Sequence, residues 1–264
     1  AAAGMVCAAR VKNKPVHIVV DRQHTMATEL IDRLATQSEY KGVFVSAEDA
    51  MIMCDFNTLL IVVDVNRPGY VESEALLQSI NKVAVIDHHR RAADYIENAV
   101  VSLHEPYASS ASELVSELLQ YLVPTSSILT AEAEAMLAGV YLDTKGFSTR
   151  TGVRTFEAAA FLRRNGADVT RVRKLFRENA AEYKAKADAV SQAEIYRNAY
   201  AISICHSEGL ASPTVVGAQA ANELLDIRGV KASFVLTEYQ NKLFFSARSI
   251  DEVNVQVIME RMGG

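Results

Sequence analysis

The chain has 264 residues, of which 50% are hydrophobic and 22% are charged, a composition typical of a soluble protein with a sizeable core. Its formal net charge of −5 argues against broad binding of long nucleic acid, which usually needs a basic surface, but allows a small phosphorylated ligand held by a few arginines. No apolar run approaches the roughly 20 residues that span a bilayer, so we expect no membrane segment in this chain, and an anchor would have to lie in a longer parent protein.

The first half of the chain predicts an alternation of strands and helices. It begins with residues 1–10, a run of small helix formers without a capping residue at its start. Strands are then predicted at residues 17–21, 59–64, 83–87 and 99–103, with helices at residues 26–34 and 74–80. Continuous Val, Ile and Leu runs indicate strands covered on both faces. Their alternation with helices predicts an α/β domain with a parallel sheet.

The second half changes character twice. Helices are predicted at residues 112–143, 153–164 and 168–176. The stretch 180–197 is charged and has few large apolar residues, so we expect an exposed linker helix. After it come a strand, a helix, a hairpin that turns at Gln240 and Asn241, and a last helix from about residue 253. The chain is therefore expected to hold a parallel-sheet domain with helices on both faces (residues 1–179), the linker helix, and a smaller α+β domain (residues 198–264).

The three cysteines are odd in number, far apart and without metal-type spacing: Cys7, Cys54 and Cys205. They are interpreted as small buried thiols of a reduced protein. We therefore expect a cytoplasmic location, or the cytoplasmic part of a membrane-anchored protein.

Acidic and imidazole residues follow the predicted strands. Asp64 ends LLIVVD, the run Asp87, His88 and His89 ends VAVID, and Asp143 ends a helix in VYLDTKGF. Parallel sheets bind ligands outside the carboxyl ends of their strands, so Asp64 and the Asp-His-His run are expected on the same rim. Carboxylates mixed with neutral imidazole suit Mn²⁺ or a similar ion. Two such ions, roughly 3.5–4 Å apart, can clamp a phosphoryl group for in-line attack.

Each of these residues alone also has an ordinary structural interpretation. An Asp at a strand end commonly forms a turn or caps a helix, and adjacent histidines can be satisfied structural residues. The other histidines have no acidic partner at ligand spacing and are interpreted as surface or core residues: His17, His24, His104 and His206.

A family resemblance adds to this pattern. VVDVNRP, VIDHHR, PYASSASELVSELL and YLDTKGFSTRTGVRTFEAAAFLRRNGAD resemble, in this order, successive motifs of the DHH phosphoesterase family. The last of them is similar to the GdpP-type cyclic-di-AMP phosphodiesterases within it. The C-terminal SARSIDEVNVQVIMERMGG resembles the DHH-associated substrate-binding domain. The resemblance covers nearly the whole chain, and an ordered set of motifs is highly specific.

The resemblance implies roles for individual residues. Asp64 matches a bridging metal ligand, and His88 and Asp143 match ligands of one of two manganese ions. His89 and Asp87 match the residues that act beside the metals, His89 by supporting them or the attacking water and Asp87 by orienting its neighbours.

In the second domain, Ser246 and Arg248 match the substrate-contacting strand, where a guanidinium suits a phosphate or a purine edge. The implied reaction is manganese-dependent hydrolysis of cyclic-di-AMP, a cyclic dinucleotide, to linear pApA. Two alternatives stay open: an oligoribonuclease or phosphoadenosine-phosphate phosphatase of the same family, and a non-catalytic nucleotide-binding module. The linker helix, with Tyr183 on it, could also pair two subunits into a homodimer.

The sequence departs from the family pattern at both ends. The family's first strand carries a His-x-x-x-Asp-x-Asp motif, whereas this chain starts inside the helix that would follow it. The family's last domain ends in a Gly-Gly-Gly-Gly-His loop, whereas this chain stops at Gly263 and Gly264. Either the chain is cut from a longer one or its flanks are not included in the sequence. The 264 residues alone are therefore expected to be weakly active or inactive.

Overall fold

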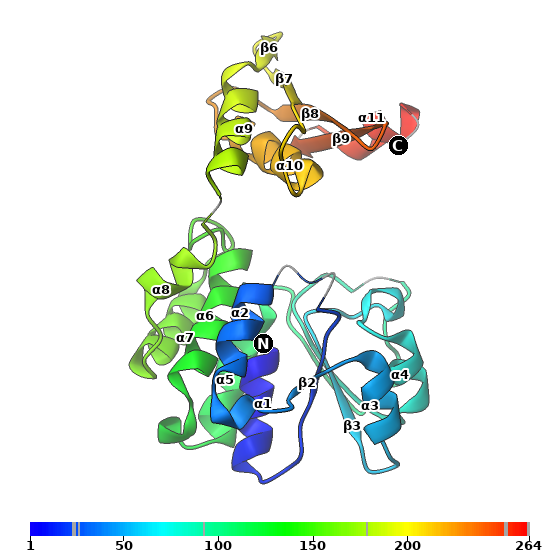
Figure 1. Ribbon diagram of the computed structural model, residues 1–264, viewed down its shortest axis with the longest axis vertical. Helices are drawn as coiled ribbons and strands as arrows, with labels where there is room; N and C mark the ends of the chain where they lie inside the picture. Colours follow the sequence, from blue (N-terminus) through cyan, green and yellow to red (C-terminus); the bar gives the residue numbers. More distant parts are fainter. Residues whose placement is uncertain (23–24, 26, 92, 178, 251–252, 263–264) are drawn as a thin grey trace. The chain divides into compact units, whose positions relative to one another are not determined.

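The computed structural model describes residues 1–22, 25, 27–91, 93–177, 179–250 and 253–262. The chain divides into two compact units, Ala1–Phe176 and Arg177–Gly264, each with its own hydrophobic core (Figure 1). Of the helices in the described ranges, none is both long and apolar enough to cross a membrane.

The first unit alternates helices with short parallel strands. Its helices are α1 (Ala2–Val11), α2 (Thr28–Ala35), α3 (Ala47–Met53), α4 (Glu74–Ser79), α5 (Ala111–Leu122), α6 (Thr130–Asp143), α7 (Val153–Arg164) and α8 (Val169–Lys174). Its strands are β1 (Ile18–Val19), β2 (Phe44–Val45), β3 (Leu59–Val63), β4 (Lys82–Asp87) and β5 (Val101–His104). Strands β1 and β2 pair with each other, and β3, β4 and β5 form a second sheet in that order. All of these pairings are parallel, which confirms the predicted α/β class.

Both faces of the β3–β4–β5 sheet are covered, because successive side chains of a strand point to opposite faces. Val63 and Ile86 join the main core, to which α1, α5, α6 and α7 contribute. Val62, Val83 and Val85 belong to a smaller cluster on the other face, toward α4. Figure 1 shows α1 and α5 on one side of these strands and α3 and α4 on the other. The continuous apolar runs therefore arise from burial on both faces, as predicted.

Helix α5 packs closely against α6, the helix that carries Asp143 at its end. A Cβ atom on Gly139 of α6 would lie 2.2 Å from Oγ of Ser112, so only glycine allows this approach. The N-terminus of α5 is capped by Ser110, whose Oγ accepts a hydrogen bond from the backbone N–H of Glu113. Helix α6 then ends at Asp143, the residue predicted to close it.

The second unit is a small α+β domain. It contains α9 (Ala180–Ser191), β6 (Glu194–Tyr196), β7 (Tyr200–Cys205), α10 (Pro213–Leu224), β8 (Ala232–Tyr239), β9 (Lys242–Ser249) and α11 (Val255–Arg261). The sheet order is β6-β7-β8-β9, with β7 and β8 parallel and the other pairs antiparallel. The predicted hairpin is confirmed: Gln240 and Asn241 both have positive φ, 52° and 57°, as a two-residue type I′ turn requires.

The helix expected over residues 180–197 is shorter than predicted, and one side of it is buried although most of its residues are exposed. Helix α9 ends at Ser191, and β6 begins at Glu194. Ala189 is only 2% exposed and lies in the core of the second unit, and Nζ of Lys186 lies 2.8 Å from Oε1 of Glu223 on α10. Small alanine side chains let two helices approach closely, so a lack of large apolar residues did not mean exposure on every side.

Candidate metal centre

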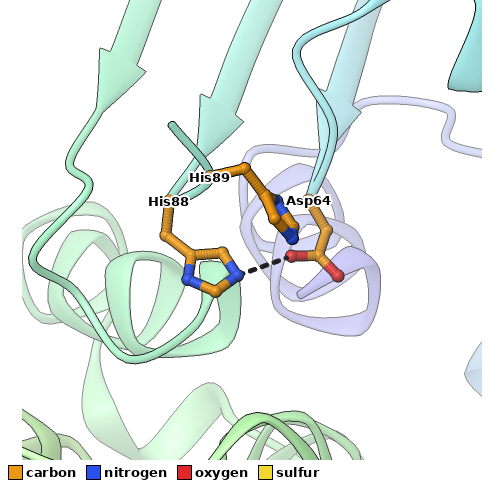
Figure 2. Close-up of side chains that lie close together, drawn as sticks. All are labelled: Asp64, His88 and His89. Carbon is orange, nitrogen blue, oxygen red and sulfur yellow. Dashed lines mark ion pairs between the residues drawn. The ribbon is translucent and has the colours of Figure 1, made fainter. Parts of the chain in front are cut away.

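The carboxyl ends of β3 and β4 lie side by side. In the parallel register Val63 pairs with Ile86, and the backbone N–H of Asp64 donates to the carbonyl of Ile86 over 2.9 Å. Asp64 has a φ of 69°, in the left-handed region that few residues other than glycine, asparagine and aspartate adopt. The chain therefore turns sharply after β3, and Figure 2 shows the Asp64 carboxylate and the His88 ring pointing toward one another.

Three residues that are remote in the sequence meet here. Nε2 of His88 lies 3.3 Å from Oδ1 of Asp64 and 3.7 Å from Oδ2 of Asp143. The His88 side chain is 5% exposed, whereas those of Asp64 and Asp143 are 50% and 29% exposed. The carboxylates therefore face solvent on one side and a buried imidazole on the other, which is the expected juxtaposition.

His89 completes the cluster. One ligand atom from each of Asp64, His88 and His89 lies within 4.8 Å of the other two, and the two imidazole rings have centroids 4.4 Å apart. Two imidazoles and a carboxylate at such distances can converge on a single cation.

The buried carboxylate of Asp87 holds the His89 ring in its orientation. The Asp87 side chain is fully buried, and its Oδ1 lies 2.8 Å from Nδ1 of His89, while Nδ2 of Asn66 donates to its Oδ2. Burial alone would raise the pKa of Asp87, but the hydrogen bonds from His89 and Asn66 outweigh it and lower the pKa. An ionised carboxylate only accepts, so Nδ1 of His89 carries the proton and Nε2 keeps its lone pair.

The tautomer of His88 follows in the same way. Its Nδ1 lies 3.3 Å from the carbonyl oxygen of Ala108, and because a carbonyl only accepts, Nδ1 is the donor. The buried Nε2 has no hydrogen-bond partner in the part of the chain that the structure describes. Its lone pair thus faces carboxylate oxygens of Asp64 and Asp143.

This arrangement fits a cation. Burial alone would lower the pKa of His88, but the attraction of Asp64 and Asp143 outweighs it and raises the pKa. Burial and the negative charge of Asp64 raise the pKa of Asp143. Both shifts mean that a positive charge stabilises the site, and a proton or a metal ion can supply that charge. Carboxylate oxygens and imidazole nitrogens are suitable ligands for a first-row divalent ion.

Two neighbours of the cluster, Asn66 and His104, were not singled out from the sequence. Asn66 lies two positions after Asp64, within the motif VVDVNRP, but no role was assigned to it. His104, interpreted as a surface or core residue, lies next to the cluster, where its Nε2 is hydrogen-bonded to the backbone carbonyl of His89. The signal for His104 was the strand register, because β5 pairs Asp87 with His104. His24, interpreted in the same way, lies outside the described residues.

The two predicted substrate residues lie in the second unit. Ser246 and Arg248 are on β9, opposite Val235 and Ser233 of β8. The Arg248 guanidinium donates to the carbonyl of Ala247 over 2.8 Å. Their role stays a prediction.

The chain is similar in sequence to a family of known proteins. The sequence model described as "DHH family, N-terminal domain" matches residues 1–140. The chain is 42% identical over 267 residues to "Cyclic-di-AMP phosphodiesterase GdpP" of Geobacillus thermodenitrificans, covering 100% of this chain and 40% of the relative. It is 38% identical over 265 residues to "Cyclic-di-AMP phosphodiesterase PdeA" of Listeria monocytogenes, covering 99% and 40%. The chain therefore spans about two fifths of the length of these curated relatives.

A solved structure shows the same fold. The exopolyphosphatase-related protein from Bacteroides fragilis matches with a TM-score of 0.74 and 18% sequence identity, over 94% of this chain and 74% of that one. The likeness extends over both units of the chain and supports the two-unit α/β architecture.

Proposed function

Because the chain belongs to the DHH family, we propose that it forms the metal-dependent phosphodiesterase module of an enzyme that hydrolyses cyclic-di-AMP to linear pApA. The observation that carries the proposal is the convergence of Asp64, His88 and Asp143, with both carboxylates within 3.7 Å of one buried imidazole nitrogen. The substrate class rests on the names of relatives that are 42% and 38% identical over 100% and 99% of this chain.

The residues of the site have separate tasks in this proposal. Asp64, His88 and Asp143 hold the metal, and a bound divalent ion would polarise phosphoryl oxygens and acidify a water. Asp87 and Asn66 hold His89 in the tautomer whose Nε2 is free, either for a metal ion or for the proton of the attacking water. In the reaction a water oxygen attacks phosphorus, the bond to the ribose 3′ oxygen breaks, and that oxygen takes up a proton.

The finer assignments are also proposals. Mn²⁺ is the ion that we expect, because mixed carboxylate and imidazole ligands suit it, and we expect two such ions in the complete module. Ser246 and Arg248 are proposed to contact the nucleotide, since a guanidinium forks toward phosphate oxygens or a purine edge.

The proposal is tested by hydrolysis assays on the chain and on the product of its complete gene, with EDTA and then with excess Mn²⁺. We expect cyclic-di-AMP to be converted to pApA only with Mn²⁺, and Asp143→Asn to abolish turnover. Asp188→Asn, which replaces an exposed carboxylate on α9, is the matched control and should retain full activity.

Two outcomes would contradict the proposal. Unchanged manganese-dependent turnover by Asp143→Asn would refute the role of that carboxylate. Rapid hydrolysis of linear pApA, with cyclic-di-AMP left intact, would instead assign the chain to the oligoribonuclease branch.

A further inference from the structure

Tyr107 is the most exposed large hydrophobic residue in the described part of the chain, at 97%. It lies between β5 and α5, in the stretch PYASS that follows His104 and Glu105. Leaving an aromatic ring in water forgoes the free energy that its burial would yield. One exposed tyrosine is ordinary, but the position of this one relative to the metal centre is not.

Tyr107 occupies a corner of a tight turn. The backbone N–H of Ala108 donates to the carbonyl of Glu105 over 3.0 Å, which closes a four-residue β-turn with Pro106 and Tyr107 at its central positions. Tyr107 is not among the residues with positive φ, so the turn is of type I, in which proline is favoured at the first central position. The backbone that carries the ring is therefore rigid.

Both ends of the turn are hydrogen-bonded to the Asp-His-His segment. At one end, the backbone N–H of Glu105 donates to the carbonyl of Asp87 over 3.0 Å. At the other, the carbonyl of Ala108 accepts from Nδ1 of His88 over 3.3 Å. Tyr107 is therefore one residue away from the group that fixes the tautomer of a candidate metal ligand. The turn is thus joined by two hydrogen bonds to the segment that carries the candidate metal ligand His88.

We infer that Tyr107 is a stacking platform for a nucleobase of the dinucleotide, an inference that rests on the proposed function. When a phosphodiester lies at Asp64, His88 and Asp143, its bases are a ribose away from phosphorus and reach the edge of the site rather than its centre. A tyrosine has only two side-chain torsions, so a rigid turn presents its ring at little entropic cost. Aromatic rings stack on any base through the π face, so Tyr107 contributes affinity rather than a choice between adenine and guanine.

The test compares Tyr107→Ala with Tyr107→Phe, and uses Tyr121→Ala as the matched control. Tyr121 is 90% exposed and lies near the far end of α5, about 15 Å along the helix from its start. Each variant of the complete gene product is assayed with cyclic-di-AMP and with its abasic analogue, which keeps both phosphodiesters but lacks both bases. Equilibrium binding of cyclic-di-AMP in EDTA, by calorimetry, gives a second readout that needs no turnover.

We expect Tyr107→Ala to raise KM for cyclic-di-AMP, and to weaken its binding in EDTA, by about 5- to 150-fold, the range that corresponds to the loss of one base stack. Turnover of the abasic analogue should be unchanged, and Tyr107→Phe and Tyr121→Ala should behave as the wild type. The melting temperature of Tyr107→Ala should equal that of the wild type, because the Tyr107 side chain is almost fully exposed.

Two results would overturn the inference. One is a KM and binding affinity for cyclic-di-AMP that Tyr107→Ala leaves within about two-fold of wild type. The other is an equal loss on the abasic analogue, which would indicate a distorted turn. If the wild type hydrolyses neither substrate, the proposed function is refuted instead, and binding of cyclic-di-AMP in EDTA then tests the role of Tyr107. Weaker binding by Tyr107→Ala alone would support the stacking platform. No binding by the wild type would reject it.

Discussion

Replacing Asp143 with asparagine is expected to have opposite effects on the metal-free and metal-bound protein. Burial and the charge of Asp64 raise the pKa of Asp143, so its ionised form is disfavoured when no cation is present. A group whose pKa is raised by folding stabilises the fold below its unfolded-state pKa, and this contribution is lost as pH rises through the folded-state pKa. At neutral pH, the metal-free variant should therefore be at least as stable as the wild type.

The metal reverses this order. At a Mn²⁺ concentration of about 100 times the dissociation constant, binding stabilises the folded state by about 2.7 kcal/mol. The first unit comprises Ala1–Phe176, and a domain of this size shifts its Tm by roughly 2–4 °C per kcal/mol. The wild type should then melt about 5–11 °C higher with Mn²⁺ than with EDTA. Asp143→Asn, which lacks one ligand, should shift by less than about 1 °C.

Differential scanning calorimetry at neutral pH measures both effects, with Asp188→Asn as the control that should keep the full manganese shift. A full manganese shift in Asp143→Asn would show that this carboxylate does not bind the metal. A metal-free variant that melts well below the metal-free wild type would show that Asp143 is a stabilising structural residue.

Three further predictions concern Asn66, His88 and Cys7. Asn66→Leu should lower the free energy of unfolding by about 1.5–3 kcal/mol, because the buried carboxylate of Asp87 loses a hydrogen-bond donor. Denaturant unfolding measures this loss, and Asn98→Leu, at an exposed position, is the control. An equal loss in both variants would contradict the prediction. Mn²⁺ affinity should weaken as pH falls through the raised pKa of His88, since the metal needs the neutral ring. Calorimetric titrations at a series of pH values measure this affinity. A constant affinity down to pH values well below the ordinary histidine pKa of about 6.5 would disprove the prediction. Burial beside Glu132 raises the pKa of the Cys7 thiol to about 12, so iodoacetamide should modify it only after unfolding, and rapid labelling of the native protein would argue against this.

Much of the fold could be predicted because burial on two faces leaves a local signature. The runs that became β3 and β4 are continuously apolar, and their ends fell within a residue of the predicted bounds. Strand β2 and helix α3 escaped prediction because the strand has two residues and the helix buries none. Neither element has enough apolar periodicity to be recognised.

Part of the candidate site could likewise be predicted from the sequence, and part could not. The residue types at 64, 88, 89 and 143 and their places at element ends could be predicted, since each follows an apolar run or closes a helical pattern. Asn66 could not, because its partner Asp87 is 21 positions away and a lone asparagine after a strand has many ordinary uses.

By itself, the sequence determined most of the elements that form, the side chains that follow them and the family whose motifs they match, because these depend on local periodicity and residue order. Only the tertiary structure decided that Asp143 reaches His88, that Asp64 turns through a left-handed conformation, and that the turn holding Tyr107 is bonded to the Asp-His-His segment. These contacts join residues brought together by strand pairing and by the packing of α6 on α5. Their geometry depends on how whole elements fit against one another, which no local stretch of sequence encodes.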